Sequence, residues 1–378
     1  MACGARAPLN PVAEYETIRA FEGPGGLAMF HLLRLGVALA LALWPVTASA
    51  EELTIPGPDG PLAGTLVQPA PYAATVVIVP GSGPTDRDGN NPLGVTAAPY
   101  RLLAEALHER GFGTLRFDKR GMFGSKAAIP DANAVTIDDY AADVAAWAGA
   151  AKAATGSPCI WLLGHSEGGL VALAAAQRAE GLCGVILVAA PGRPLGQAIR
   201  EQLTANPANA PLLKQAFAAL DRLEGGKRVK TARLAPPLQQ LFAAPVQGYL
   251  IDLLRRDPAP LAAALPVPLM IVSGGKDLQV GPADGAALRS ARPEARHAVV
   301  LEMNHVLKEV DGDDRAANFA AYADPSLPVS AKLVDLITTF MLDKGPQVQG
   351  SLGPRKASSR GSRRAALDPG AGRNKARA

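Results

Sequence analysis

The sequence is poor in the residues that build metal and redox centres. Its 378 residues include three cysteines and five histidines, which do not cluster at the spacings of a zinc site. No G-x-G-x-x-G motif follows a predicted strand, so the turn that binds a dinucleotide is also missing. We therefore expect no metal and no cofactor, which excludes zinc enzymes and nicotinamide-dependent oxidoreductases.

Long hydrophobic runs are equally scarce. Leu35 to Trp44 is apolar, but it has about half of the roughly 20 residues needed to cross a bilayer, and Pro45 interrupts it. A membrane anchor is the competing interpretation of this run, and its shortness argues against one. We expect no stable membrane anchor.

The same run has the flanks of an export signal. His31 and Arg34 precede it, and the small residues Ala48-Ser49-Ala50 follow it. Met29 to Ala50 therefore predicts a signal peptide that is cleaved before Glu51, and a periplasmic or secreted protein. The three glutamates upstream do not suit a positively charged start, which suggests that translation begins at Met29.

Positive charge is concentrated at the C-terminal end. The formal net charge is +4, yet residues 344–378 hold nine Lys and Arg against a single Asp, so the rest of the chain is mildly acidic. This tail has no aromatic side chain that could stack on a base. Its Gly, Ser, Ala and Arg content is typical of a solvated, disordered extension, and we expect no nucleic-acid partner.

Two of the three cysteines, Cys159 and Cys183, fall in the predicted mature chain. Each precedes a predicted strand, which begins at Ile160 or at Val185. The like ends of neighbouring parallel strands lie about 4.8 Å apart, so one disulfide could form in an oxidising compartment. Two buried thiols are the alternative, and the sequence does not decide between them.

Between residues 51 and 343, short apolar or β-branched runs alternate with helical patterns. This alternation predicts an α/β domain with a mainly parallel sheet covered on both faces. A hairpin is expected from Leu53 to Val67, followed by strands at Thr75–Val79, Gly113–Phe117, Ile160–Gly164, Val185–Ala190, Leu269–Ser273 and Ala298–Leu301. Helices are expected at Tyr100–Arg110, Thr136–Ala154, Gly168–Ala179 and Ser330–Leu342.

The alternation stops between about residues 193 and 265. This segment shows helix-like pieces separated by several prolines. Because strands of one sheet bracket it, we expect a helical cap over the carboxyl ends of those strands rather than an independent domain.

The strongest chemical signal is Gly164-His165-Ser166-Glu167-Gly168. It follows an apolar strand and precedes an alanine-rich helix, which is the context of a nucleophile elbow. The two glycines let strand and helix approach closely, and the sharp turn exposes the hydroxyl group of Ser166. We therefore predict that Ser166 is a nucleophile.

A serine nucleophile needs a hydrogen-bonded base. Among the histidines, only His305 follows the last predicted strand and so reaches the sheet edge where Ser166 lies. The others fall in the signal segment, in an early helix, in the backbone of the elbow and before the last strand: His31, His108, His165 and His297. A structural surface histidine is the alternative interpretation of His305.

The base in turn needs a carboxylate that orients it. Asp277 follows the strand Leu269–Ser273 after Gly274-Gly275-Lys276, which places it at the same sheet edge. Asp284 is the nearest competitor and ranks below it. The order along the chain is then serine, acid, histidine.

Negative charge that develops on a substrate oxygen needs two preorganised donors. We expect the backbone amides of Glu167 and Ser82 to supply them, the latter from the turn Pro80-Gly81-Ser82-Gly83. A plain Gly-Pro turn without this role is the alternative. Asp86, Arg87 and Asp88 follow this turn. They could contact substrate, but an ion-paired group that stabilises the loop is the favoured interpretation, which also applies to Asp118 and Arg120.

Several segments together resemble bacterial exported α/β-hydrolases related to the serine aminopeptidase and lysophospholipase-like group. They are Gly81 to Asn90, Arg116 to Gly121 with Gly124-Ser125, Gly164 to Gly169, Gly275-Lys276-Asp277 and Asn304-His305. The resemblance covers about Leu53 to Leu342. It implies the α/β-hydrolase fold with an eight-stranded, mainly parallel sheet, a Ser166–Asp277–His305 triad, and hydrolysis of a small carboxylic ester. One departure is Pro80-Gly81, where many relatives carry His-Gly. This departure concerns the assignment of the Ser82 amide as an oxyanion donor, because Ser82 follows directly.

Two other functions are weighed against this one. A peptidase that releases N-terminal residues would need an acidic patch in the cap, where the acidic residues are spread too loosely to indicate one. A non-catalytic binding protein on the same fold is disfavoured because all three triad residue types are present. The sequence indicates neither the ester substrate nor the oligomeric state.

Overall fold

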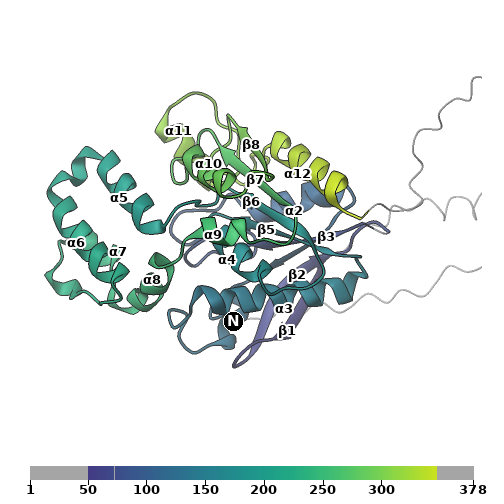
Figure 1. The fold of residues 1–378 in the computed structure, drawn as a ribbon, viewed down its shortest axis with the longest axis horizontal. Coiled ribbons are helices and arrows are strands. Elements are labelled where there is room, and N and C mark those ends of the chain that lie inside the picture. The colour runs from purple at the N-terminus through teal and green to yellow at the C-terminus, as the bar shows by residue number, and fades with distance from the viewer. Residues whose placement is uncertain (1–49, 72, 347–378) are drawn as a thin grey trace, which may run out of the picture. The chain divides into compact units, whose positions relative to one another are not determined.

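The computed structural model describes residues 50–71 and 73–346. The predicted export signal before Ala50 and the predicted tail after residue 346 lie outside these residues. A single eight-stranded sheet forms the centre, in the strand order β1-β2-β4-β3-β5-β6-β7-β8 (Figure 1). The strands are β1 (Ala50–Pro56), β2 (Pro61–Val67), β3 (Thr75–Val79), β4 (Gly113–Phe117), β5 (Ile160–His165), β6 (Leu182–Val188), β7 (Leu269–Gly274) and β8 (Arg296–Val300).

The sheet is mainly parallel, as predicted. β1 and β2 form the expected hairpin, and β2 also runs antiparallel to β4. From β4 to β8 every neighbouring pair is parallel. The carboxyl ends of these six strands therefore meet at one edge of the sheet, where loops from distant parts of the sequence come together.

Helices cover both faces of the sheet. The helices α2 (Pro99–Glu109) and α12 (Ala331–Lys344) pack on one face, whereas α3 (Ile137–Thr155), α4 (Glu167–Ala176) and α10 (Pro282–Ala291) pack on the other. On β5, Ile160 and Leu162 belong to the core under α3 and α4, while Trp161 and Leu163 belong to the core under α2 and α12. This alternation follows from the two-residue period of a strand, and it is the reason that central strands are apolar throughout.

The N-terminus of α3 is fixed by a capping box. The hydroxyl group of Thr136 accepts a hydrogen bond from the Asp139 amide, and the Asp139 carboxylate accepts one from the Thr136 amide. Such a cap contributes about 1 kcal/mol. Arg120 also docks on this helix, because its Nε donates to Asp143 Oδ2 at 2.7 Å. Arg120 is thus an ion-paired structural residue, which is the role that the sequence favoured for it.

Five helices occupy the segment between β6 and β7. They are α5 (Leu195–Ala205), α6 (Leu213–Glu224), α7 (Pro236–Leu241), α8 (Gln247–Leu254) and α9 (Pro258–Ala263). The first four lie apart from the sheet at the left of Figure 1 and enclose a small apolar core that includes Leu220, Leu223 and Phe242. We call α5 to α9 the cap.

Several strand boundaries differ from the prediction, most clearly those of β6 and β8. β8 begins at Arg296, two residues before the apolar run that suggested it, and β6 ends at Val188, before Ala190. β8 is an edge strand that pairs only with β7, and its residues are mostly exposed or half-buried. An edge strand tolerates polar side chains, so its ends do not follow hydrophobicity.

Cys159 and Cys183 form a disulfide, with their Cα atoms 5.2 Å apart. β5 and β6 are adjacent and parallel, and Ile160 pairs with Leu182. Cys183 lies inside β6 rather than before it, because this strand begins at Leu182. Of the two interpretations left open by the sequence, the structure contains the bridge.

Across residues 50–71 and 73–346, none of the helices combines the length and the apolar character that a membrane crossing requires.

Candidate active site

The predicted site residues all follow carboxyl ends of parallel strands. Ser82 follows β3, Ser166 follows β5, Asp277 follows β7 and His305 follows β8. Because these strands run in the same direction within the run β3-β5-β6-β7-β8 of one sheet, four loops that are far apart in the sequence meet at one edge. This is the edge at which open α/β sheets usually bind ligands.

Ser166 occupies a strained turn between β5 and α4. Its backbone has φ 53° and ψ −130°, a conformation that L-residues rarely adopt and that costs about 1–3 kcal/mol. A Cβ atom on Gly164 would collide with the carbonyl oxygen of Gly168, and one on Gly168 would collide with that of Val79. The turn therefore requires both glycines of the motif, and backbone strain of this kind clusters at functional sites.

A cavity of about 170 Å³ lies at Ser166, and we call it the serine cavity. Ser82 and Glu167, whose amides were predicted to bind an oxyanion, line it together with Ser166. The remaining walls come from the loop after β7 and from the cap, through residues such as Gln279, Leu195 and Leu253. Glu167 is the first residue of α4, where backbone amides lack a helical partner and the helix dipole favours negative charge.

His305 and Asp277 form a buried pair. His305 Nδ1 lies 2.8 Å from Asp277 Oδ2, and the Asp277 side chain is fully buried. The other carboxylate oxygen accepts hydrogen bonds from the amides of Gln279 and Val280 at 2.7 and 2.9 Å. A carboxylate held in this way accepts the Nδ1 proton, so Nε2 of His305 is left unprotonated and able to take up a proton.

Asp284, the competitor of Asp277 for the role of the orienting acid, has different partners. Its carboxylate pairs with Arg193 at 2.9 Å and accepts a hydrogen bond from the Gly192 amide at 3.0 Å. It therefore joins α10 to the start of the cap segment. The hydrogen bond to His305 belongs to Asp277.

His165 joins three segments through its side chain, whereas the sequence placed it only in the backbone of the elbow. Its Nε2 lies 2.8 Å from the carbonyl oxygen of His305, and its Nδ1 lies 2.8 Å from the hydroxyl group of Tyr100. A carbonyl can only accept, so Nε2 donates and Nδ1 accepts from Tyr100. Strand alternation was an available signal, because it puts His165 on the face of β5 that carries Leu163 and faces α2.

The buried position of His165 predicts a pH dependence of stability. Burial, together with the nearby His305, lowers the pKa of His165 to about 3 from an ordinary value of 6.5. Between these pH values the unfolded chain binds a proton here and the folded chain does not. The contribution of His165 to folding is therefore complete above about pH 6.5 and falls by about 1.4 kcal/mol per pH unit below it.

Urea unfolding between pH 7.5 and pH 4 checks this expectation. We expect His165→Gln, which cannot bind a proton, to lose stability less steeply than the wild-type protein as the pH falls. Equal slopes for the two proteins would contradict the assignment of a neutral, buried imidazole to His165.

Gly81 is held from both sides. Its amide donates to the Tyr100 hydroxyl oxygen at 2.9 Å, and its carbonyl oxygen accepts from Lys119 Nζ at 2.7 Å. The carbonyl group of Gly81 and the amide of Ser82 belong to one planar trans peptide and point in opposite directions. Fixing the carbonyl therefore fixes the direction of the Ser82 amide. Lys119 is buried, and burial lowers its pKa.

Removing the Lys119 ammonium group is expected to slow catalysis more than it weakens substrate binding. Loss of an oxyanion donor costs about 10²–10³ in kcat, so we expect Lys119→Met, which only loosens one donor, to lower kcat by about 10- to 100-fold with a smaller change in KM. The melting temperature should be maintained, because an apolar side chain replaces a buried charge. Lys126→Met, at an exposed position nearby, is the matched control. An unchanged kcat in Lys119→Met would refute the inference that Lys119 fixes the Gly81 carbonyl group and thereby the Ser82 amide.

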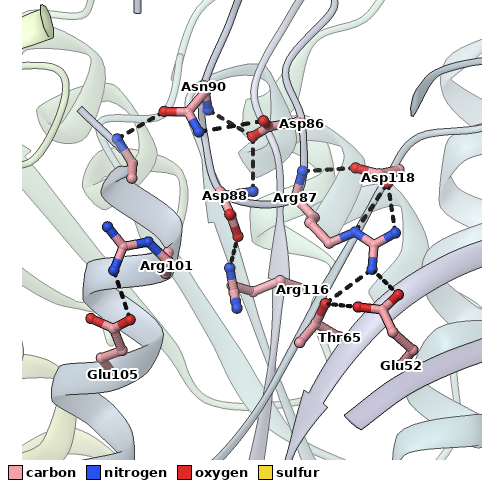
Figure 2. Close-up of polar contacts among 11 residues, drawn as sticks. Glu52, Thr65, Asp86, Arg87, Asp88, Asn90, Arg101, Glu105, Arg116 and Asp118 are labelled. Atoms are coloured by element: carbon pink, nitrogen blue, oxygen red, sulfur yellow. Dashed lines mark hydrogen bonds and ion pairs between the residues drawn. The ribbon is translucent and has the colours of Figure 1, made fainter. Parts of the chain in front are cut away.

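The charged loop after the turn at residues 80–83 is an ion-paired group, as favoured from the sequence. Figure 2 shows Arg87 bound to Asp118, and Nη2 of Arg87 lies 2.9 Å from Asp118 Oδ2. Asp88 pairs with Arg116, and Asp86 accepts hydrogen bonds from the amides of Asp88 and Asn90. These bonds tie the loop to the end of β4, and they hold the adjacent turn at residues 80–83 in place.

The Glu167 side chain connects the elbow to the cap. Its carboxylate accepts a hydrogen bond from the hydroxyl group of Tyr249 on α8 at 2.6 Å. Burial and the neighbouring Glu167 raise the pKa of Tyr249 well above its ordinary value, so this hydroxyl group remains a donor. The sequence offered no account of this side chain, because its partner is 82 residues away on the cap.

Among the residues that the structure describes, no group of three or more His, Cys, Asp or Glu side chains is arranged to hold a metal ion.

Comparisons with known proteins identify similar chains. The model of the alpha/beta hydrolase family matches residues 76–321. Esterase EstD of Thermotoga maritima is 27% identical over 308 residues, which cover 79% of this chain and 68% of the relative. The structure of the Pyrococcus furiosus esterase Pf2001 covers 79% of this chain and 92% of its own, at 16% identity and a TM-score of 0.51. At this identity the structural likeness supports the fold.

Proposed function

The chain belongs to the alpha/beta hydrolase family, and from this premise we propose that it is a carboxylic ester hydrolase with Ser166 as nucleophile, His305 as base and Asp277 as orienting acid. The observation that carries the proposal is the buried His305–Asp277 pair, at the sheet edge that also holds the strained Ser166 turn. The similarity to Esterase EstD supports the reaction class.

The proposed reaction has two stages. Ser166 attacks the ester carbonyl while His305 Nε2 takes the hydroxyl proton, and His305 then returns this proton to the leaving alcohol. Asp277 stabilises the imidazolium that forms between the two steps. A water molecule, activated by the same histidine, then hydrolyses the acyl-enzyme.

The backbone amides of Ser82 and Glu167 are the proposed oxyanion donors. Both residues line the serine cavity, and each donor in such a site contributes about 3 kcal/mol to the stabilisation of the transition state. The hydrogen bonds that hold Gly81 support Ser82 in this role. The position of Glu167 at the start of α4, where backbone amides lack helical partners, supports Glu167.

A substrate panel tests the reaction class. The mature protein is incubated with p-nitrophenyl esters of increasing chain length and, in parallel, with aminoacyl p-nitroanilides. We expect hydrolysis of the esters and at most slow hydrolysis of the anilides. Efficient release from the anilides with inert esters would favour a peptidase, and inertness toward both would favour a non-catalytic binding protein.

We further propose that the protein is exported to the periplasm or secreted, after cleavage behind Ala50. The flanks of the run Leu35–Trp44 and the disulfide between Cys159 and Cys183 support this, because disulfides persist in oxidising compartments. N-terminal sequencing of the protein recovered from the periplasm and the medium should begin at Glu51. Recovery of an uncleaved chain in the cytoplasm alone would refute export.

A further inference from the structure

A second cavity lies on the other side of Glu167 from the serine cavity, and we call it the tyrosine cavity. Its volume is about 480 Å³, against about 170 Å³ for the serine cavity, and Glu167 lines both. The turn at residues 80–83 also borders both cavities, through Ser82 in the serine cavity and Gly83 in the tyrosine cavity. The tyrosine cavity therefore adjoins the site at Ser166, because Glu167 and the turn at residues 80–83 contribute to the walls of both cavities.

The walls of the tyrosine cavity are largely apolar and include three aromatic rings. Met122 and Val246 line it, the latter from the cap, and the rings of Tyr140 and Tyr249 meet edge to face with centroids 6.0 Å apart. Phe123, also in the lining, is 46% exposed and has a positive φ of 42°. Backbone strain of this kind clusters at active sites and ligand clamps, so Phe123 is a candidate contact for a ligand in this cavity.

Two side chains bring hydrogen-bond donors to this cavity. Tyr140 is 5% exposed, and its hydroxyl group makes no hydrogen bond within the part of the chain that the structure describes. Lys119 Nζ lies 5.5 Å from the centre of the Tyr140 ring and uses one of its donors on Gly81. The Tyr140 hydroxyl group is therefore free to donate a hydrogen bond to an acceptor on a ligand.

The position of the cavity relative to His305 decides which side of the ester it holds. The leaving alcohol receives its proton from His305 and must lie beside that residue. Gln279 and Val280, which donate to Asp277, line the serine cavity, whereas no described residue after β7 or β8 lines the tyrosine cavity. The alcohol therefore belongs in the serine cavity and the acyl group in the tyrosine cavity.

We propose that the tyrosine cavity binds the acyl group of the substrate, and that this group is an arylalkanoic acyl chain whose ring carries an oxygen acceptor for Tyr140. This inference rests on the proposed ester hydrolysis at Ser166. It names the substrate class as esters of aromatic acids, with the ring held between Met122 and the two tyrosine rings.

The test measures kcat/KM for p-nitrophenyl 3-(4-methoxyphenyl)propionate, p-nitrophenyl 3-phenylpropionate and p-nitrophenyl acetate. For the wild-type protein we expect the methoxyphenyl ester to be the best substrate and the acetate the poorest. Met122→Trp fills the cavity and should lower the ratio of the arylpropionates to the acetate at least 10-fold. Tyr140→Phe removes only the hydroxyl group and should lower the ratio of the methoxyphenyl to the phenyl ester about 2- to 10-fold.

Leu241→Trp, at an exposed cap position outside both cavities, is the matched control and should leave every ratio unchanged. Val246→Trp fills the same cavity from the cap and serves if Met122→Trp does not fold. If the wild type hydrolyses the acetate but neither filling variant changes the ratios, the acyl assignment is wrong and the proposed function stands. If no p-nitrophenyl ester is hydrolysed, the proposed function itself fails.

Discussion

Replacement of Ser166 by alanine is expected to lower kcat for ester hydrolysis by about 10⁴- to 10⁶-fold. The alanine side chain has no hydroxyl group, so no acyl-enzyme can form and only the binding and oxyanion contributions remain. KM should change little, because the turn and both cavities keep their shape. The measurement is steady-state hydrolysis of a p-nitrophenyl ester by the purified variant.

The control for this result is Ser290→Ala, an exposed serine on α10. This variant should retain wild-type kcat. The far-ultraviolet circular dichroism of both variants should match that of the wild type, which separates loss of chemistry from loss of fold. If Ser166→Ala kept a tenth or more of the wild-type kcat, the nucleophile would be another group.

Replacement of Asp277 by asparagine is expected to lower kcat by about 10⁴-fold. The two loop amides of Gln279 and Val280 donate to one oxygen of Asp277, and the amide oxygen of asparagine keeps those two bonds. The amide nitrogen then faces His305 Nδ1, which must accept a hydrogen bond. The imidazole proton moves to Nε2, the atom that should take a proton from Ser166, and the base is in the wrong tautomer.

Asp284→Asn is the informative comparison for Asp277. The side chains of Asp284 and Asp277 are both buried, but the partners of Asp284 are Arg193 and Gly192. This variant should lose stability through the broken ion pair and lower kcat by less than about 10-fold, since its change does not reach the His305 tautomer. A large fall in kcat for Asp284→Asn, with a small fall for Asp277→Asn, would exchange the roles of the two acids.

Much of the fold was predictable because its central strands are buried on both faces. β3 and β4 have the predicted ends, since each is a short buried strand between polar or turn-forming residues. The edge strand β8 was placed less well, because Arg296 and His297 lie on an edge that needs no apolar side chain. The Thr136–Asp139 cap was predictable because its signal is local in sequence.

The site residues were predictable to the extent that strand order dictates their position. A residue just after a parallel strand lies at the carboxyl edge, and this rule alone brings Ser166, Asp277 and His305 to one edge. The contacts of His165 with Tyr100 and of Glu167 with Tyr249 could not be derived in the same way. They depend on the packing of a helix and of the cap against the sheet, which no local pattern records.

The most direct test of the central claim is covalent trapping of the nucleophile. The mature protein is incubated with a fluorophosphonate that carries an alkyl group, and its intact mass is measured before proteolytic mapping of the adduct. If Ser166 is the nucleophile, we expect one adduct per chain, on the peptide that contains Ser166. Hydrolysis of p-nitrophenyl esters should fall in proportion to the fraction of protein that carries the adduct. An unmodified Ser166 in a protein that still hydrolyses esters, or an adduct on a different residue that abolishes hydrolysis, would contradict this assignment.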